Sequence, residues 1–76
     1  MSIAEVYRAM KDNLKAEEMY KKAIDLEPDN VNYLLTFADF QHELGKKSQA
    51  VYYLRLALKE DPDNRIAKEM MHELEG

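Results

Sequence analysis

Apolar residues recur along the chain at intervals of three and four, the spacing that places them on one face of an α-helix. Between residues 31 and 44 the pattern includes Leu34, Phe37 and Ala38, and the last segment carries an apolar stripe opposite a charged side. The pattern predicts an all-α protein with helices at about residues 3–11, 14–27, 31–44, 48–60 and 65–75.

The residues between these segments are those that start and stop helices. Glu27 and Asp61 stand directly before prolines, whose rings exclude the preceding residue from the α region. Gly45 suits the left-handed position just past a helix end. Polar side chains that accept hydrogen bonds from free N–H groups are expected to cap the following helices. The expected caps are Ser2 (with Glu5 in a capping box), the pairs Asp29-Asn30 and Asp63-Asn64, and Ser48.

The strongest pattern in the chain is an internal repeat with an offset of 34 residues. Segment 15–30 aligns on segment 49–64 with five of sixteen positions identical, among them Pro28 and Pro62. Each period holds two of the expected helices. The chain is therefore expected to build one helix–turn–helix unit twice and to close it with a fifth helix.

A 34-residue period, two helices per period and a closing proline resemble the tetratricopeptide-repeat family. The resemblance implies antiparallel helical hairpins stacked as a short right-handed superhelix, an α-solenoid of five helices. It implies one domain, 1–76, with a truncated repeat at about 2–30, a repeat at 31–64 and a capping helix at 65–75. The family's signature places hold Leu34, Phe37, Ala38, Gly45, Ala50, Leu54, Ala57, Leu58 and Pro62 in the second repeat, and Ile3, Ala4, Tyr7, Ala16, Tyr20, Ala23, Ile24 and Pro28 in the first.

The departures from the family pattern predict that the second repeat is less tightly packed than a consensus repeat. Asn13 is expected to take the left-handed conformation that the family's glycine provides in the first turn. Gln41 and Lys47 stand where a large aromatic residue is usual, and Phe40 is expected to compensate in part. Glu60 replaces a usual leucine.

Composition and charge exclude several classes of function. The 76 residues include no cysteine, which removes disulfides and thiolate metal sites and favours a reducing compartment. The net charge of −4 disfavours nucleic-acid binding, because phosphate backbones require a basic face. The sequence has no apolar run long enough to span a bilayer, and its first residues do not have a signal-peptide pattern. A cytoplasmic location is therefore expected.

Side chains that carry chemistry are few. His42 lies near Asp39 and Glu43, but a metal site needs three or four convergent ligands, and a solvated polar face is the simpler interpretation. Ser2 and Ser48 are better explained as helix caps than as nucleophiles. The sequence contains no glycine-rich phosphate loop. We expect a protein without catalytic activity and without a cofactor.

The resemblance also implies a concave groove lined by the first helix of each repeat. The family pattern places Glu5, Arg8, Asn32, Leu35, Asp39, His42, Glu43, Glu69 and Glu73 in this groove. Five carboxylates against one arginine favour a basic or polar peptide, or a helix, of a partner protein, with Leu35 as the apolar contact. Some family members grip a C-terminal carboxylate, but the corresponding positions hold Leu35, Thr36, Asp39 and Glu69, which disfavours that ligand.

A second surface emerges when the repeats are compared. Where the first repeat has Glu18 and Lys22 on its outer side, the second has Tyr52 and Leu56. This apolar pair is either an isolated exposed pair or the contact surface of a homodimer. The truncated opening of the first repeat is a further edge that another copy could complete. Two interpretations remain open: an adaptor that binds a partner protein in its groove, and a self-associating structural repeat protein, natural or engineered.

Overall fold

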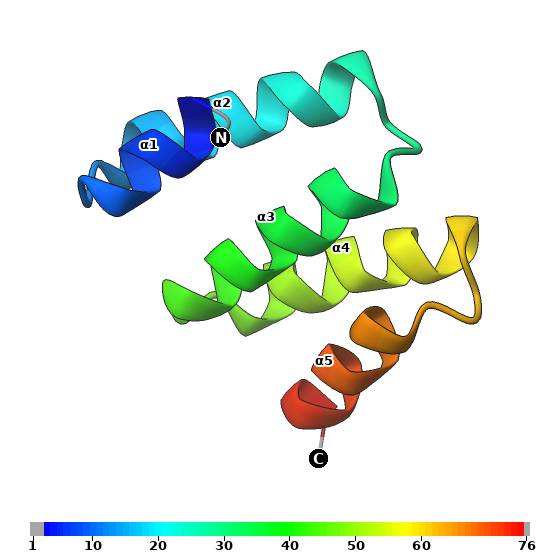
Figure 1. Ribbon diagram of the computed structural model, residues 1–76. Helices are drawn as coiled ribbons and strands as arrows, with labels where there is room; N and C mark the ends of the chain where they lie inside the picture. Colours follow the sequence, from blue (N-terminus) through cyan, green and yellow to red (C-terminus); the bar gives the residue numbers. More distant parts are fainter. Residues whose placement is uncertain (1–2, 76) are drawn as a thin grey trace.

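The computed structural model describes residues 3–75, and these form five helices joined by short turns (Figure 1). The helices are α1 (Ile3–Ala9), α2 (Asn13–Leu26), α3 (Val31–Glu43), α4 (Lys47–Glu60) and α5 (Arg65–Glu75). The described residues contain no strand, so the predicted all-α class is confirmed. Each helix boundary lies within two residues of its predicted position.

Consecutive helices form antiparallel hairpins, α1 with α2 and α3 with α4, and α5 follows against α4 (Figure 1). The most extensive contact joins α3 to α4, whereas the two hairpins meet less extensively, through α2 and α3. This stacked arrangement is the helical repeat that the 34-residue offset predicts. It places α1, α3 and α5, the first helices of successive units, next to one another along one side of the stack (Figure 1).

Each predicted Asp-Asn pair supplies the cap of the following helix, and in α3 and α5 the capping residue is the asparagine. The Asn30 side chain accepts a hydrogen bond from the Tyr33 N–H at 3.1 Å, and the Asn64 side chain accepts one from the Ala67 N–H at 2.9 Å. The predicted cap at Ser48 is wrong. Helix α4 begins at Lys47, before Ser48, and its N-cap residue Lys46 makes no side-chain cap hydrogen bond. The Ser2 cap lies outside the described residues.

In each hairpin, one residue in the left-handed conformation follows the end of the first helix. Gly45 has a φ of +79°, as predicted, and Lys11 has a φ of +64°. The prediction that Asn13 would take this conformation is wrong, since Asn13 is the first residue of α2. The turn geometry recurs with the repeat, and the offset of 34 residues pairs Lys11, not Asn13, with Gly45. A residue with a Cβ pays roughly 1–2 kcal/mol for this conformation.

The core consists of two clusters that share α3. The N-terminal cluster joins Ala4, Ala16, Tyr20, Phe37 and Phe40, with the Tyr20 and Phe40 ring centroids 5.2 Å apart. The C-terminal cluster includes Leu34, Leu35, Ala38, Ala50, Leu54, Ala57, Ala67 and Leu74. The three alanines expected at helix crossings, Ala38, Ala50 and Ala57, are each 0% exposed. Helix α3 therefore contributes one face to each cluster and holds the two hairpins together.

Gln41 lies inside this core at a position where the family usually has an aromatic residue. Its side chain is 1% exposed, and its Nε2 donates a hydrogen bond to Oε1 of Glu17 at 3.2 Å. Phe40, which is also 1% exposed, fills the adjacent space against Tyr20. The amide therefore links α3 to α2 through a polar contact, in a place where burial without a partner is unfavourable.

Candidate partner-binding groove

A hollow lies between α3 and α5 on the side formed by the first helices. It has a volume of about 380 Å³ and is lined by Asn32, Leu35, Thr36 and Asp39 from α3 and by Ile66 and Met70 from α5. We call this the α3–α5 hollow. Three of the nine predicted groove residues, Asn32, Leu35 and Asp39, are thus brought together here.

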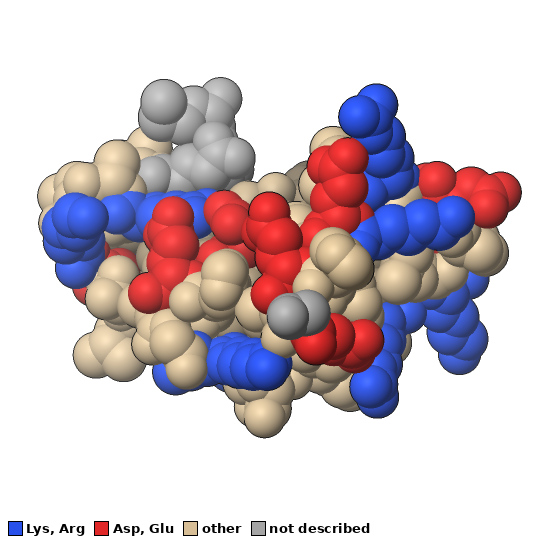
Figure 2. All heavy atoms as spheres, turned by 90° about the horizontal axis from the view of Figure 1, so that it is seen from below, with Lys and Arg blue, Asp and Glu red and all other residues tan. Residues whose placement is uncertain are grey.

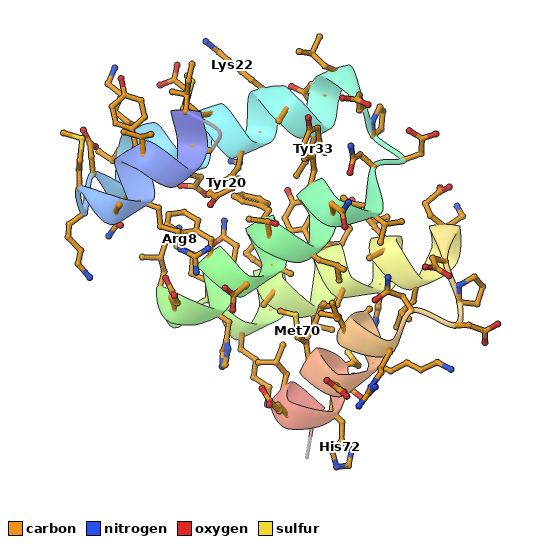
Figure 3. The ribbon with its side chains drawn as sticks, in the orientation of Figure 1. Arg8, Tyr20, Lys22, Tyr33, Met70 and His72 are labelled. Carbon is orange, nitrogen blue, oxygen red and sulfur yellow. The ribbon has the colours of Figure 1, made fainter. Side chains whose placement is uncertain are left out.

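The floor of the α3–α5 hollow is apolar. Leu35 is 7% exposed, so it packs into the C-terminal cluster as well as facing the hollow. Met70 packs against the same cluster, and Figure 3 shows it where α5 faces the second hairpin. Ile66 is 59% exposed and remains accessible at the rim. A ligand would therefore meet an isoleucine and a methionine that the sequence analysis did not place in the groove.

The repeat itself contains the signal that would have found Ile66 and Met70. An offset of 34 residues relates them to Asn32 and Thr36, which line the same hollow from α3. The equivalent helix of each unit therefore contributes the same two positions. The predicted groove did not include Ile66 or Met70, because its residues follow from the family pattern and not from the repeat offset.

Arg8 connects α1 to the acidic side of α3. Its Nη2 lies 2.7 Å from Oδ2 of Asp39 and 2.6 Å from Oε1 of Glu43, and its Nε donates a hydrogen bond to Oε2 of Glu43 at 3.1 Å. The guanidinium also sits 5.7 Å from the centre of the Phe40 ring. Figure 3 shows Arg8 extending from α1 toward α3. The hydrogen bond with Glu43 raises the pKa of Arg8 above its usual range, although partial burial opposes the shift.

This bridge changes the electrostatic picture drawn from the sequence. Asp39 and Glu43 are 52% and 57% exposed, so both face solvent while sharing one guanidinium. Because Arg8 offsets one of these two negative charges, the net negative charge beside α3 is smaller than the number of carboxylates suggests. Acidic side chains still gather across the middle of the face seen in Figure 2, with lysines and arginines around them.

The remaining predicted groove residues do not join the α3–α5 hollow. Glu69 and Glu73 line a separate hollow of about 360 Å³ together with Lys68 and His72, all on α5. Glu69 accepts a hydrogen bond from Arg65 at 2.9 Å. His72 points away from the body of the molecule (Figure 3). His42 is exposed and lines neither hollow.

Three further observations concern Glu5, metal ions and membrane-spanning helices. The structure describes the backbone of Glu5, which belongs to α1, but not its side chain. Among the side chains that the structure describes, no group of three or more His, Asp or Glu residues is placed to hold a metal ion. Within residues 3–75, no helix combines the length and the apolar character needed to cross a membrane.

The apolar pair on the outer side of α4 is less exposed than expected. Tyr52 is 55% exposed, and its ring meets the Tyr53 ring edge-on at 5.1 Å. Leu56 is partly buried and packs against the C-terminal cluster. Tyr52 therefore carries most of the exposed apolar surface of this pair. Partial burial also raises the pKa of Tyr53, with smaller contributions from Tyr52 and two carboxylates.

Comparison with known proteins agrees with the architecture. The sequence profile of the family described as "Tetratricopeptide repeat" matches residues 7–73. The chain is also similar to "Sperm-associated antigen 1" of Rattus norvegicus and of Mus musculus, with 40% identity over 60 residues in each case. The matched segment covers 79% of this chain and 7% of each relative, so the chain spans only a small part of their length.

Proposed function

Because the chain belongs to the tetratricopeptide-repeat family, which generally mediates protein–protein interaction, we propose that it holds a peptide or helix of a partner protein in the α3–α5 hollow. The observation that carries this proposal is the apolar floor with an accessible Ile66 and a half-exposed Asp39 at its edge. Apolar anchors surrounded by polar groups are the usual composition of a recognition site. The module acts by binding and performs no chemistry, and its lack of cysteine supports a cytoplasmic location.

The partner segment is basic or polar, with an aliphatic side chain next to its cationic residue. The aliphatic side chain would rest on Ile66 and Met70, and the cation would meet Asp39. Asp39 and Glu43 share the single guanidinium of Arg8, so one negative charge remains without a counter-charge. A cationic side chain of the partner would neutralise it. An acidic C-terminal peptide would instead face these carboxylates and be repelled.

Selection of peptides from a random display library, followed by fluorescence titration of the enriched sequences, tests this proposal. We expect enrichment of peptides that combine lysine or arginine with leucine, isoleucine or methionine. Ile66→Asp should weaken their binding about tenfold, because it puts a charge at the apolar edge. Asp39→Asn should weaken it about three- to tenfold at low salt.

The matched control is Asp63→Asn, which removes the same charge from the turn between α4 and α5, where the Asp63 side chain is 99% exposed. This variant should bind like the wild type. Enrichment of acidic C-terminal peptides, or equal binding by wild type, Ile66→Asp and Asp39→Asn, would show that the α3–α5 hollow is not the site.

The second candidate function is self-association through Tyr52, which is supported by its 55% exposure on the outer side of α4. Of the predicted surface pair Tyr52 and Leu56, only Tyr52 is suitable for mutation. Leu56 is partly buried, so changing it would also disturb the core. If Tyr52→Glu leaves the sedimentation coefficient of a concentrated solution unchanged, this surface does not mediate self-association.

A further inference from the structure

Asp39 belongs both to the lining of the α3–α5 hollow and to the charge bridge between α1 and α3. Its Oδ2 accepts a hydrogen bond from Nη2 of Arg8 at 2.7 Å, and its side chain is 52% exposed. The function proposed above assigns the same carboxylate to a cationic side chain of the partner. A positive charge of this chain therefore already lies where the positive charge of the partner is expected.

Arg8 is held in place by Glu43 as well as by Asp39. Two nitrogens of its guanidinium meet both oxygens of the Glu43 carboxylate, with Nη2 at 2.6 Å from Oε1 and Nε at 3.1 Å from Oε2. This forked arrangement gives arginine–carboxylate pairs a defined geometry. The guanidinium also lies 5.7 Å from the centre of the Phe40 ring, and the Arg8 side chain is 21% exposed. Arg8 would therefore stay beside Asp39 while a ligand is bound.

The repeat architecture does not require an arginine at this place. The offset of 34 residues makes His42 the counterpart of Arg8, and it makes Glu73 the counterpart of Asp39. His42 is exposed and lines neither hollow. The next unit is thus built with a different, solvent-exposed side chain at the same position. Replacement of Arg8 should accordingly leave the helical stack intact, so its effect on binding can be measured.

Arg8 reduces the local charge that attracts a cationic partner. Together with Asp39 and Glu43 it leaves one net negative charge, whereas the two carboxylates alone would present two. Arg8 also repels an incoming cation directly. At about 5 Å in a partly hydrated site, this repulsion corresponds to about a three- to tenfold loss of affinity. The loss grows with each further positive charge on the partner, since each is repelled in turn.

We propose that Arg8 is a specificity-determining residue of the α3–α5 hollow, which favours partner segments with a single cationic side chain over segments with several. Glu43 is its positioning residue, because it fixes the guanidinium beside Asp39. This inference rests on the function proposed above and adds the number of charges that the partner carries. The site is thus selective for an aliphatic segment with one lysine or arginine and against a polybasic segment.

Parallel selection from one random peptide display library, on the wild type and on Arg8→Gln at low salt, tests the proposal. Glutamine retains a polar side chain and removes the charge. Peptides enriched on Arg8→Gln should carry about one more lysine or arginine on average than those enriched on the wild type. The matched control is Arg55→Gln, which removes an arginine that links α4 to α5, 3.9 Å from Glu75. It should enrich the same peptides as the wild type.

Titration separates an electrostatic role of Arg8 from a structural one. The probes are an enriched peptide with a single lysine or arginine and its analogue with glutamine at that place. Arg8→Gln should bind the cationic peptide about three- to tenfold more tightly than the wild type at low salt, and added salt should reduce the gain. Its affinity for the neutral analogue should change by less than about twofold. A purely structural role would change both affinities alike.

Two results would overturn the proposal and leave the proposed function intact, given that the wild type binds the cationic peptide and Asp39→Asn weakens this binding. They are equal affinities of the wild type and Arg8→Gln for the cationic peptide, and a gain that extends equally to the neutral analogue. Selection of no basic peptides on the wild type would instead contradict the proposed function, and this inference with it. Arg8→Met, which keeps an unbranched side chain beside Phe40, is the second variant and should show the same gain.

Discussion

The two hairpins follow one plan and differ in how completely they are filled. Ala57 in the second hairpin is 0% exposed and packs in one cluster with Leu34. Its counterpart Ala23 is partly exposed and lines a hollow of about 360 Å³ between α1, α2 and the start of α3, which we call the N-terminal hollow. The turn of the second hairpin uses Gly45, and that of the first places Lys11 in the same left-handed region. The repeat therefore fixes where each residue lies, while a few side chains decide how well each unit is packed.

The largest effect should come from truncating a fully buried side chain of the second hairpin. Leu34→Ala should lower the free energy of unfolding by about 2–5 kcal/mol, because it opens a cavity in the second hairpin. Ile3→Ala, at a site that is 64% exposed, should lower it by less than about 1 kcal/mol. Urea denaturation measures both values. Equal losses would contradict the difference in packing.

The paired alanines offer the next test. Ala57→Leu should destabilise the protein by about 1–3 kcal/mol, because a 0% exposed alanine at a helix crossing leaves no room for a larger side chain. Ala23→Leu should be neutral or stabilising, since it extends into the N-terminal hollow. Thermal melts of dilute protein compare the two. An unchanged midpoint for Ala57→Leu would show that the assigned register is wrong.

The two turns should respond in opposite directions. Lys11→Gly should stabilise the protein by about 1 kcal/mol, because glycine adopts a φ of +64° without strain. Gly45→Ala should destabilise it by about the same amount. A Cβ at Gly45 meets nothing within 4 Å, so the backbone conformation alone sets this loss. Chemical denaturation of both variants measures the pair, and a loss on Lys11→Gly would contradict the account.

The smallest effect concerns the charge bridge between the hairpins. Arg8→Gln should lower stability by about 0.5–1 kcal/mol at low ionic strength, and salt should reduce the difference. Arg65→Gln is the matched control, because Arg65 is 89% exposed and pairs only within α5, with Glu69. Its effect should be smaller. Thermal midpoints at low and high salt provide the comparison, and equal effects for the two arginines would show that Arg8 does not fasten α1 to α3.

The fold could be predicted from the sequence because its main signals are local and repeated. Prolines, asparagine caps and Gly45 define where helices start and stop, and each acts within a few residues of its own position. The errors arose where two signals competed. Asn13 is a better left-handed residue than Lys11, but the geometry of the repeated turn decided the position.

The candidate site could be predicted only in part. Asn32, Leu35 and Asp39 lie together as expected because helical spacing alone brings them to one side of α3. The separation of Glu69 and Glu73 depends on how α5 rotates against α4, which periodicity does not determine. The bridge from Arg8 to Asp39 and Glu43 spans helices distant in the sequence, so composition gave only the number of charges and not their pairing.

Native-state hydrogen exchange, followed by NMR on dilute protein, tests the central difference between the hairpins most directly. Amides of α3 and α4 should exchange only on global unfolding, whereas amides of α1 and α2 should exchange faster through local opening at the N-terminal hollow. Ala23→Leu should slow exchange in α2 and leave α4 unchanged. Uniform protection across both hairpins of the wild type would contradict the account.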